Sequence, residues 1–213
     1  MGTDDRGCVV VVAKDLPKIQ ARVRFPPPSL GMLPSLWHAS EDPSIEIFHP
    51  HRAPTAQIDD NLVWAVDDVH VPAYWFPRDC PRATFWIGPN TTPADAAWLN
   101  GATRVHAIEW AWWKAFRTGR IYLYLVPPET FLVHNEGAGY YVSRESVTPL
   151  ARFEIDDLIQ RHAQAGIELR VMNELWPLWD RVVSSTLEFS GIRLRNARER
   201  SSVAHRAFDK RNQ

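Results

Sequence analysis

The sequence predicts a single α+β domain in which a twisted mixed β-sheet carries short helices packed on it. Short segments with apolar residues at alternate positions outnumber segments of helical period. The chain has 17 prolines in 213 residues, most of them before residue 150, which favours short elements joined by ordered loops. The predicted strands and helices do not alternate strictly, so a doubly wound fold is not expected.

The two ends of the chain differ from its middle. Residues 1–31 are expected to form an N-terminal extension, because Phe25-Pro26-Pro27-Pro28 is typical of a polyproline spacer and Met32 begins a new apolar segment. Within the extension, Cys8–Ala13 could pair as an edge strand. The domain is expected over residues 32–197, and residues 198–213 form a basic tail. A solvated helix or frayed end is favoured for this tail over a contact with an anionic partner.

The first half of the domain is expected to consist of short strands and turns. A turn follows the first strand, with Ser40 as a cap, and two acids suit the start of the helix that begins at Asp67. The predicted elements are strands at Ser35–Ala39, Ile45–Phe48, Leu62–Val66 and Arg82–Ile87, and a short helix at Asp67–Phe76.

The second half contains the strongest helix prediction, Thr103–Thr118. Val105, Ile108 and Trp112 fall on one face at helical spacing, and Gly119 follows the end. Asp156 should cap a helix over Asp157–Ala165 that Gly166 ends, and a helix over Leu175–Thr186 should be interrupted near Pro177. The remaining predictions are strands at Ile121–Val126, Ala138–Ser143, Ala151–Ile155 and Ile167–Met172.

Charge and cysteine content exclude several classes of protein. A formal net charge of −1 is unlike that of a general nucleic-acid-binding protein. Two cysteines cannot form a secreted disulfide framework, and neither a signal peptide nor an apolar stretch of about 20 residues is present. A cytoplasmic protein without a membrane span is expected. The sequence has no phosphate loop, dinucleotide-binding glycine pattern or nucleophile elbow, so no catalytic residue is assigned.

Ten tryptophans are many for this length. Large core residues are the favoured interpretation, and the walls of a pocket for a flat ligand are the alternative.

Phe76–Arg82 is the densest block of charged residues and prolines. Arg78 and Arg82 could hold a phosphate or carboxylate through their planar guanidinium groups, whereas an Arg–Asp79 link that ties down the loop is the structural alternative. For Cys80 a buried, inert thiol is favoured over a reactive one.

The histidines do not predict a metal site. His38, His49 and His51 lack a third ligand at a convincing spacing, and the pair His106 and Glu109 would place two ligands on one face of the predicted helix. No metal and no firm cofactor are assigned.

Several positions in chain order resemble the ADP-ribosyltransferase superfamily. His38 ends the first core strand and is followed by Ser40, Tyr74 lies on the following helix, and Gly139–Ser143 form a late strand. The resemblance implies that His38 bonds a ribose, that Tyr74 stacks on nicotinamide and that NAD is the ligand. If the protein is an enzyme, the resemblance implies an ADP-ribosyltransferase or NAD glycohydrolase. Gly139 and Tyr140 stand where that superfamily has its catalytic glutamate, so binding without transfer is expected.

Five segments resemble a family of uncharacterised bacterial proteins more closely, from about Leu33 to Asn196. That family implies no activity. The segments are Leu36–Ile45, Val63–Asp67, Phe76–Arg82, Gly139–Ser143 and Ser190–Asn196.

Together these observations predict a domain that binds a small anionic or aromatic ligand of the nucleotide or NAD type. His38 and Tyr74 are expected to share a cleft with the arginines at its rim. The alternative is a structural or partner-binding protein with a tryptophan-rich core and no small-molecule site. The predicted ligand-binding residues are His38, Ser40, Tyr74, Arg78, Arg82 and Tyr140.

Overall fold

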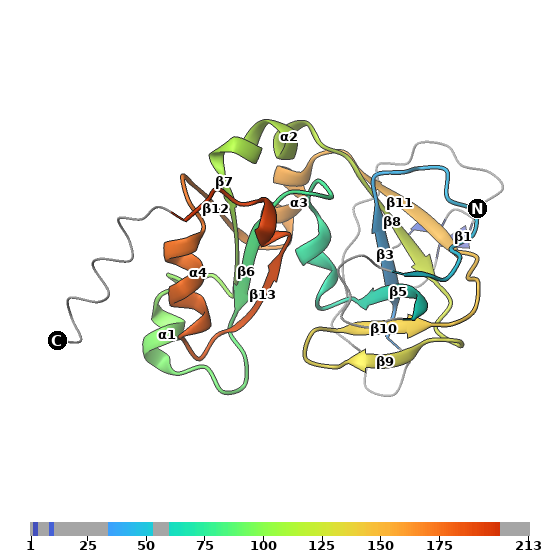
Figure 1. Cartoon of the computed structure of the whole chain (residues 1–213), viewed down its shortest axis with the longest axis horizontal. Helices are drawn as coiled ribbons and strands as arrows, with labels where there is room; N and C mark the ends of the chain where they lie inside the picture. The colour runs from blue at the N-terminus through green and yellow to red at the C-terminus, as the bar shows by residue number, and fades with distance from the viewer. Residues whose placement is uncertain (1, 4–8, 11–33, 53–59, 201–213) are drawn as a thin grey trace. The chain divides into compact units, whose positions relative to one another are not determined.

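A computed structural model describes residues 2–3, 9–10, 34–52 and 60–200 of the chain. It divides the chain into two compact units, each made of two separated segments (Figure 1). Unit 1 comprises residues 1–78 and 120–156, and unit 2 comprises residues 79–119 and 157–213. The α+β class is confirmed, but the strands form two main sheets, one in each unit, instead of one. That residues 32–197 act as a single domain stays a prediction.

Little of the chain ends falls within the described residues. In the predicted extension, β1 (Gly2–Thr3) pairs antiparallel with β2 (Val9–Val10). The rest of the predicted edge strand Cys8–Ala13, the polyproline segment and residues 201–213 of the basic tail lie outside the described residues.

The sheet of unit 1 is antiparallel throughout. Its strands follow the order β11-β8-β3-β5-β10-β9, with β4 also paired to β5. The one-turn 3-10 helix η1 (Val71–Tyr74) follows β5. The strands are β3 (Leu36–Ser40), β4 (His51–Arg52), β5 (Asn61–Asp67), β8 (Ile121–Val126), β9 (Leu132–Asn135), β10 (Tyr140–Ser143) and β11 (Ala151–Ile155).

Both faces of the central strands in this sheet are buried. On one face Leu36, Ala65 and Tyr124 pack with Phe48 and their neighbours in one hydrophobic cluster. On the other face Trp37 contacts Phe153 edge to face, with ring centroids 5.6 Å apart. Because most residues on both faces of these strands are shielded from water, the strands contain nearly continuous apolar runs.

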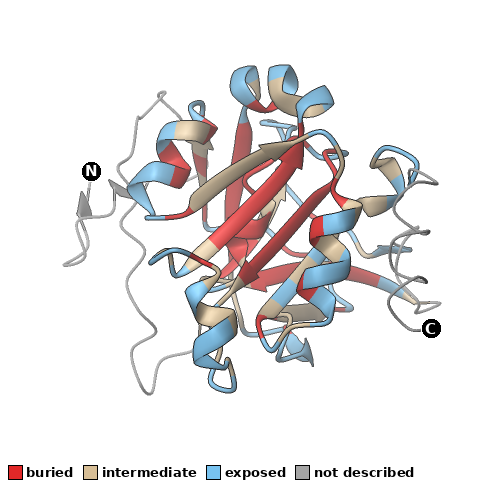
Figure 2. Ribbon diagram, turned by 90° about the vertical axis from the view of Figure 1, so that its left-hand side faces the viewer, coloured by how far each residue is buried: buried red, intermediate tan, exposed pale blue. Residues whose placement is uncertain are grey.

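Unit 2 holds a mixed four-stranded sheet in the order β12-β7-β6-β13, in which only β12 and β7 are parallel. Its central strands are buried, while the helices keep exposed outer sides (Figure 2). The strands are β6 (Arg82–Trp86), β7 (Arg104–Glu109), β12 (Glu168–Met172) and β13 (Glu188–Ile192). The helices are α1 (Pro93–Ala97), η2 (Trp110–Trp112), α2 (Trp113–Thr118), α3 (Leu158–Gln164), α4 (Trp176–Val183) and η3 (Leu194–Asn196).

The predicted helix Thr103–Thr118 is wrong in its first half. Residues 104–109 form β7, a central strand whose Val105 and Ala107 face the hydrophobic core while His106 points to the opposite face. A fully buried strand is apolar on both faces, so its sequence also satisfies a helical pattern. Only Trp113–Thr118 is α-helical, and Gly119 ends it as expected.

Other elements differ in smaller ways. Ile45–Phe48 contributes a single bridge, Phe48 to Val147, in place of a strand. The helix expected over Asp67–Phe76 shrinks to η1. Pro177 lies in the first turn of α4, where proline is tolerated, so it does not interrupt the helix. Asp157, and not Asp156, caps α3 by accepting a hydrogen bond from the backbone N–H of Gln160. The elements β9, β13 and α1 were not predicted.

None of the helices among the described residues is long and apolar enough to cross a membrane.

Candidate functional site

An aromatic row lies on one face of the unit 1 sheet, across β5, β10 and β9. Trp64 is its centre, and its ring meets His134 at 5.1 Å and Tyr140 at 6.1 Å, both edge to face. Tyr140 stands directly opposite Val66, so by strand alternation it shares the face of Trp64. Trp64 and Tyr140 are partly exposed and His134 is exposed. The row therefore offers ring surface to a ligand.

Tyr74 reaches this row from η1. Pro72 fixes the backbone at the start of η1, which is one short turn closed by the Trp75 N–H to Pro72 carbonyl hydrogen bond of 3.2 Å. The Tyr74 hydroxyl donates to the Tyr140 hydroxyl at 2.9 Å. The structure thus brings together two of the predicted ligand-binding residues, Tyr74 and Tyr140.

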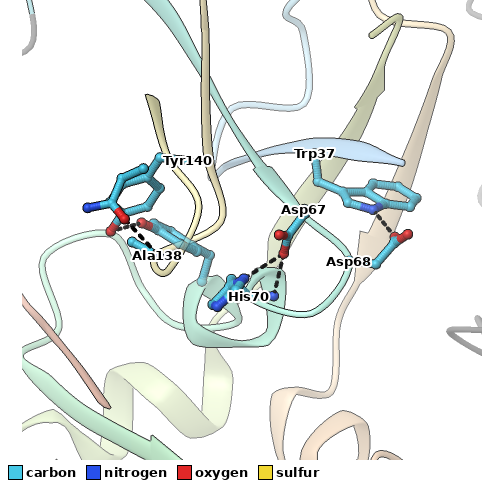
Figure 3. Close-up of polar contacts among 8 residues, drawn as sticks. Trp37, Asp67, Asp68, His70, Ala138 and Tyr140 are labelled. Atoms are coloured by element: carbon cyan, nitrogen blue, oxygen red, sulfur yellow. Dashed lines mark hydrogen bonds and ion pairs between the residues drawn. The ribbon is translucent and has the colours of Figure 1, made fainter. Parts of the chain in front are cut away.

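An aspartate–histidine pair lies where β5 ends (Figure 3). Asp67 Oδ1 accepts two hydrogen bonds from His70, one from its backbone N–H at 2.9 Å and one from Nδ1 at 2.7 Å. Because Nδ1 donates to a carboxylate, this nitrogen carries a proton. The side chains of His70 and Asp67 keep 14% and 17% of their surface exposed, so the pair is enclosed but not sealed.

Gly139 allows this pair to pack against the turn before β10. Its φ of +65° lies in the left-handed region. A Cβ at this position would lie 2.7 Å from Asp67 Oδ2 and would also collide with the His70 ring. The Asp67 backbone N–H donates to the Gly139 carbonyl at 3.1 Å, which holds the two segments together. Only glycine fits both the conformation and the space.

The neighbouring Asp68 has a different role. Its Oδ1 accepts a 2.6 Å hydrogen bond from the indole N–H of Trp37 (Figure 3). Burial raises the pKa of Asp68, and the Trp37 hydrogen bond opposes this rise. Asp68 therefore anchors a core tryptophan.

We name the rings Trp64, Tyr74, His134 and Tyr140, together with Asp67 and His70 at the end of β5, the aromatic–acid site. Asp67 follows Val66 in β5, so by strand alternation its side chain points to the sheet face opposite the rings. The sequence indicated Tyr74 and Tyr140 but missed the other four residues. Asp67, for example, was interpreted as an acid at a helix start. The spacing Asp-x-x-His after a buried strand is the signal that could have indicated the pair.

His38 lies on the opposite face of the sheet. It stands directly across from the core residue Tyr124, and its ring is 4.4 Å from that of Phe48. Its Nδ1 donates to the Trp64 carbonyl at 2.8 Å. Burial lowers the pKa of His38 more than this hydrogen bond raises it, and His51 and Arg78 lower it further. His38 is therefore held as a neutral ring.

The expected common cleft of His38 and Tyr74 is therefore wrong. Trp37 and Tyr140 both stand opposite Val66, and the next residue after Trp37 must point the other way. Since Tyr74 bonds Tyr140, the sheet itself separates Tyr74 from His38.

Ser40 and Arg78 are tied into local structure near His38. The Ser40 hydroxyl accepts from the Asp42 backbone N–H at 3.1 Å, as expected for a cap of the turn. The Arg78 backbone N–H donates to Glu41 Oε1 at 3.3 Å. The expected roles of Ser40 and Arg78 in ligand binding stay predictions.

Arg82 and Cys80 are buried in unit 2. Arg82 Nη1 donates to the Cys80 carbonyl at 2.9 Å, so its side chain is not exposed at a rim as expected. Burial raises the pKa of the Cys80 thiol to about 12, although Arg82 opposes this. Asp79 lies 3.7 Å from Arg193 Nε, an ion pair that the sequence did not indicate.

His106 forms a buried histidine pair with His162 of α3. His162 Nδ1 bonds the Leu158 carbonyl at 2.6 Å, and its Nε2 is 3.0 Å from His106 Nδ1. Glu109, expected beside His106, points to the other face, where it accepts from the backbone N–H groups of Leu175 and Arg198. Within residues 34–52 and 60–200, no three histidine, cysteine or acidic side chains converge on a possible metal position.

Most of the tryptophan side chains are neither fully buried nor fully exposed. Trp37 and Trp75 are buried, Trp110 is 54% exposed, and the other seven are partly exposed. This distribution suits rings that cover the edges of the two cores.

Comparison with curated proteins and with solved structures finds no match, and nothing in it supports the resemblance to ADP-ribosyltransferases. A family model does match, over residues 37–197, and it includes both sheets and the aromatic–acid site. The chain therefore belongs to DUF6886, a family of unknown function.

Proposed function

We propose that unit 1 binds a small ligand with a planar ring, of the nucleotide or NAD type, at the aromatic–acid site. One observation carries the proposal: a partly exposed row of rings at Trp64, His134 and Tyr140 lies on one face of the sheet, and the Tyr74 hydroxyl bonds the Tyr140 hydroxyl beside it. Small-molecule sites commonly combine such aromatic surface with a few polar groups of fixed direction.

The rings supply the affinity in this proposal. Stacking of a base on an aromatic side chain contributes about 1–3 kcal/mol per base. The hydroxyls of Tyr74 and Tyr140 already bond each other, so they present a fixed donor and acceptor beside the rings. Fixed polar groups select the orientation of the ligand without a cost for ordering them.

Binding, and not transfer, is what the site supports. Gly139 and Tyr140 occupy the position of the glutamate that the ADP-ribosyltransferase resemblance would require, and Gly139 is needed there for packing. We therefore expect NAD to be bound without release of nicotinamide.

Calorimetric titration with NAD, ADP-ribose, adenosine and nicotinamide tests the proposal. At least one of them should bind, and Trp64→Ala should weaken binding by roughly 5-fold to 150-fold, which corresponds to the loss of one stacked ring. Trp110→Ala is the matched control, because Trp110 is an exposed tryptophan of unit 2.

Two results would contradict the proposal. One is the absence of binding for all four compounds at millimolar concentration. The other is an equal loss of affinity in Trp64→Ala and Trp110→Ala, which would mean that ring removal acts through general stability.

A further inference from the structure

We propose that a strip of tryptophan and basic side chains that follows β7 docks the protein on an anionic lipid membrane. The tryptophan–basic strip consists of Trp110, Trp113, Lys114 and Arg117, which lie on η2 and α2 of unit 2 (Figure 1). The inference goes beyond the ligand site proposed for unit 1, and the two sites share no residue.

Helical geometry brings the four side chains together. Trp110–Trp112 is a turn of 3-10 helix, in which residues three apart lie one above the other. Trp110 and Trp113 therefore meet edge to face, with ring centroids 6.0 Å apart. Trp113 begins the α-helix, in which residues three and four apart are neighbours, so Arg117 lies next to both Trp113 and Lys114. The aromatic and cationic side chains form one continuous strip.

The strip faces solvent. Trp110 is 54% exposed, more than any other tryptophan of the chain, and Lys114 and Arg117 are exposed as well. Phe116 of the same helix is fully buried and contacts His162 of α3, with ring centroids 5.4 Å apart. Because Phe116 is held in the core, the side of α2 that carries Lys114 and Arg117 is turned outward. A large ring beside two cations is thus available to a partner.

The strip is positively charged. Neither Lys114 nor Arg117 forms an ion pair with any residue that the structure describes. The neighbouring helix α3, which contacts α2, contains no acidic residue between Leu158 and Gln164. Anionic headgroups would supply the complementary charge, with a gain in affinity of about fivefold for each Lys or Arg near the membrane surface.

A membrane suits this strip better than a nucleic acid or a protein does. Tryptophan is enriched at the membrane–water interface because its body is apolar and its indole N–H is polar, and nearby Lys and Arg extend to the headgroups. The ring planes of Trp110 and Trp113 are inclined by 73°, so they do not form a parallel platform for successive bases. Lysine is depleted in protein–protein interfaces, which disfavours a protein partner at Lys114.

Co-sedimentation of the full-length protein with lipid vesicles tests the inference. Vesicles of phosphatidylcholine and phosphatidylglycerol in equal parts should bind the protein. Vesicles of phosphatidylcholine alone should bind it at least roughly tenfold more weakly, because they offer no net negative charge to the two cations. Binding to the mixed vesicles should fall to the same level in about 1 M salt, where the screening length is about 3 Å.

Substitutions then locate the contact. Trp110→Ala should weaken binding to the mixed vesicles by about tenfold or more, because roughly half of a large ring no longer enters the interface. Lys114→Gln should weaken it by about fivefold through the loss of one cation. Phe189→Ala and Arg195→Gln are the matched controls and should leave binding unchanged, because they alter an exposed ring and an exposed cation elsewhere in unit 2.

Three results would overturn the inference. One is equal binding to the mixed and the uncharged vesicles, or binding to neither. Another is unchanged binding by Trp110→Ala and Lys114→Gln, which would place the membrane contact elsewhere in the chain. The third is binding of a single-stranded oligonucleotide, and not of vesicles, that Trp110→Ala abolishes, because the strip would then contact nucleic acid. Each of these results leaves the ligand-binding proposal for unit 1 unaffected.

Discussion

Acidification should destabilise unit 2 through its buried histidine pair. His162 donates from Nδ1 to the Leu158 carbonyl, so its Nε2 accepts from His106 Nδ1, and both rings must be neutral for this arrangement. Burial lowers the pKa of His162 to about 4, and burial together with the neighbouring His162 holds the pKa of His106 well below its usual value. Protonation of either ring would place a charge in the interior.

The pKa of His162 determines the direction and size of the effect. The unfolded chain binds a proton near pH 6.5 and the folded chain near pH 4, so the stabilisation is complete above pH 6.5 and is lost as the pH falls from 6.5 to 4. A shift of roughly 2.5 pKa units corresponds to about 3 kcal/mol. His106 adds to the loss in the same direction.

Urea unfolding followed by tryptophan fluorescence at several pH values between 7 and 4 measures this loss. His162→Asn replaces the titrating ring but keeps an amide donor for the Leu158 carbonyl. The variant should have a lower free energy of unfolding at pH 7 than the unmodified protein. Between pH 7 and pH 4, however, its free energy of unfolding should fall by about 3 kcal/mol less. His49→Asn, which changes an exposed histidine, should follow the unmodified protein. If His162→Asn loses stability as steeply as the unmodified protein, the histidine pair is not the cause.

Three further predictions follow from burial and position. Cys80 should react with a disulfide reagent at pH 8 far more slowly than free cysteine, because a pKa of about 12 leaves almost no thiolate. Rapid labelling of Cys80 in the native protein would contradict this prediction. Glu109→Ala should reduce the free energy of unfolding by about 1–3 kcal/mol, because the backbone N–H groups of Leu175 and Arg198 lose their acceptor. In the same denaturation assay, Glu145→Ala should change the free energy of unfolding little, because Glu145 is exposed. Deletion of residues 1–31 should leave the melting temperature within a few degrees, where about 1 kcal/mol corresponds to roughly 2–4 °C, and a fall beyond about 10 °C would show that the extension belongs to the core.

Local sequence patterns determined most of the strands. Ile121–Val126 and Ala151–Ile155 match their predicted bounds, and the capped helix before Gly166 is one residue shorter at each end than predicted. These segments succeed because their apolar runs are short and bounded by turn residues, so period and length agree. Tyr74 and Tyr140 were singled out through the resemblance to the ADP-ribosyltransferase superfamily and not through these patterns, and their role in ligand binding stays a prediction.

Tertiary pairing decided what the patterns left ambiguous. Residues 104–109 are a strand because β6 and β12 bond both of their edges, and no local signal separates such a buried strand from a buried helix. The face of each residue also depends on register: His38 and Tyr74 lie on opposite sides because Trp37, and not His38, stands across from Val66. A shift of one residue would reverse this, and only strand pairing specifies it.

The sequence by itself thus determined the α+β class and the positions of about half of the strands, because these depend on the period and composition of short segments. The tertiary structure alone decided the division into two sheets, the convergence of Asp67, His70 and Gly139, and the burial of Arg82 and Cys80. The physical reason is that Gly139 lies 72 residues beyond Asp67 in the chain, and their contact exists only because β10 pairs with β5. Contacts between distant segments follow from the packing of whole elements, which no local pattern encodes.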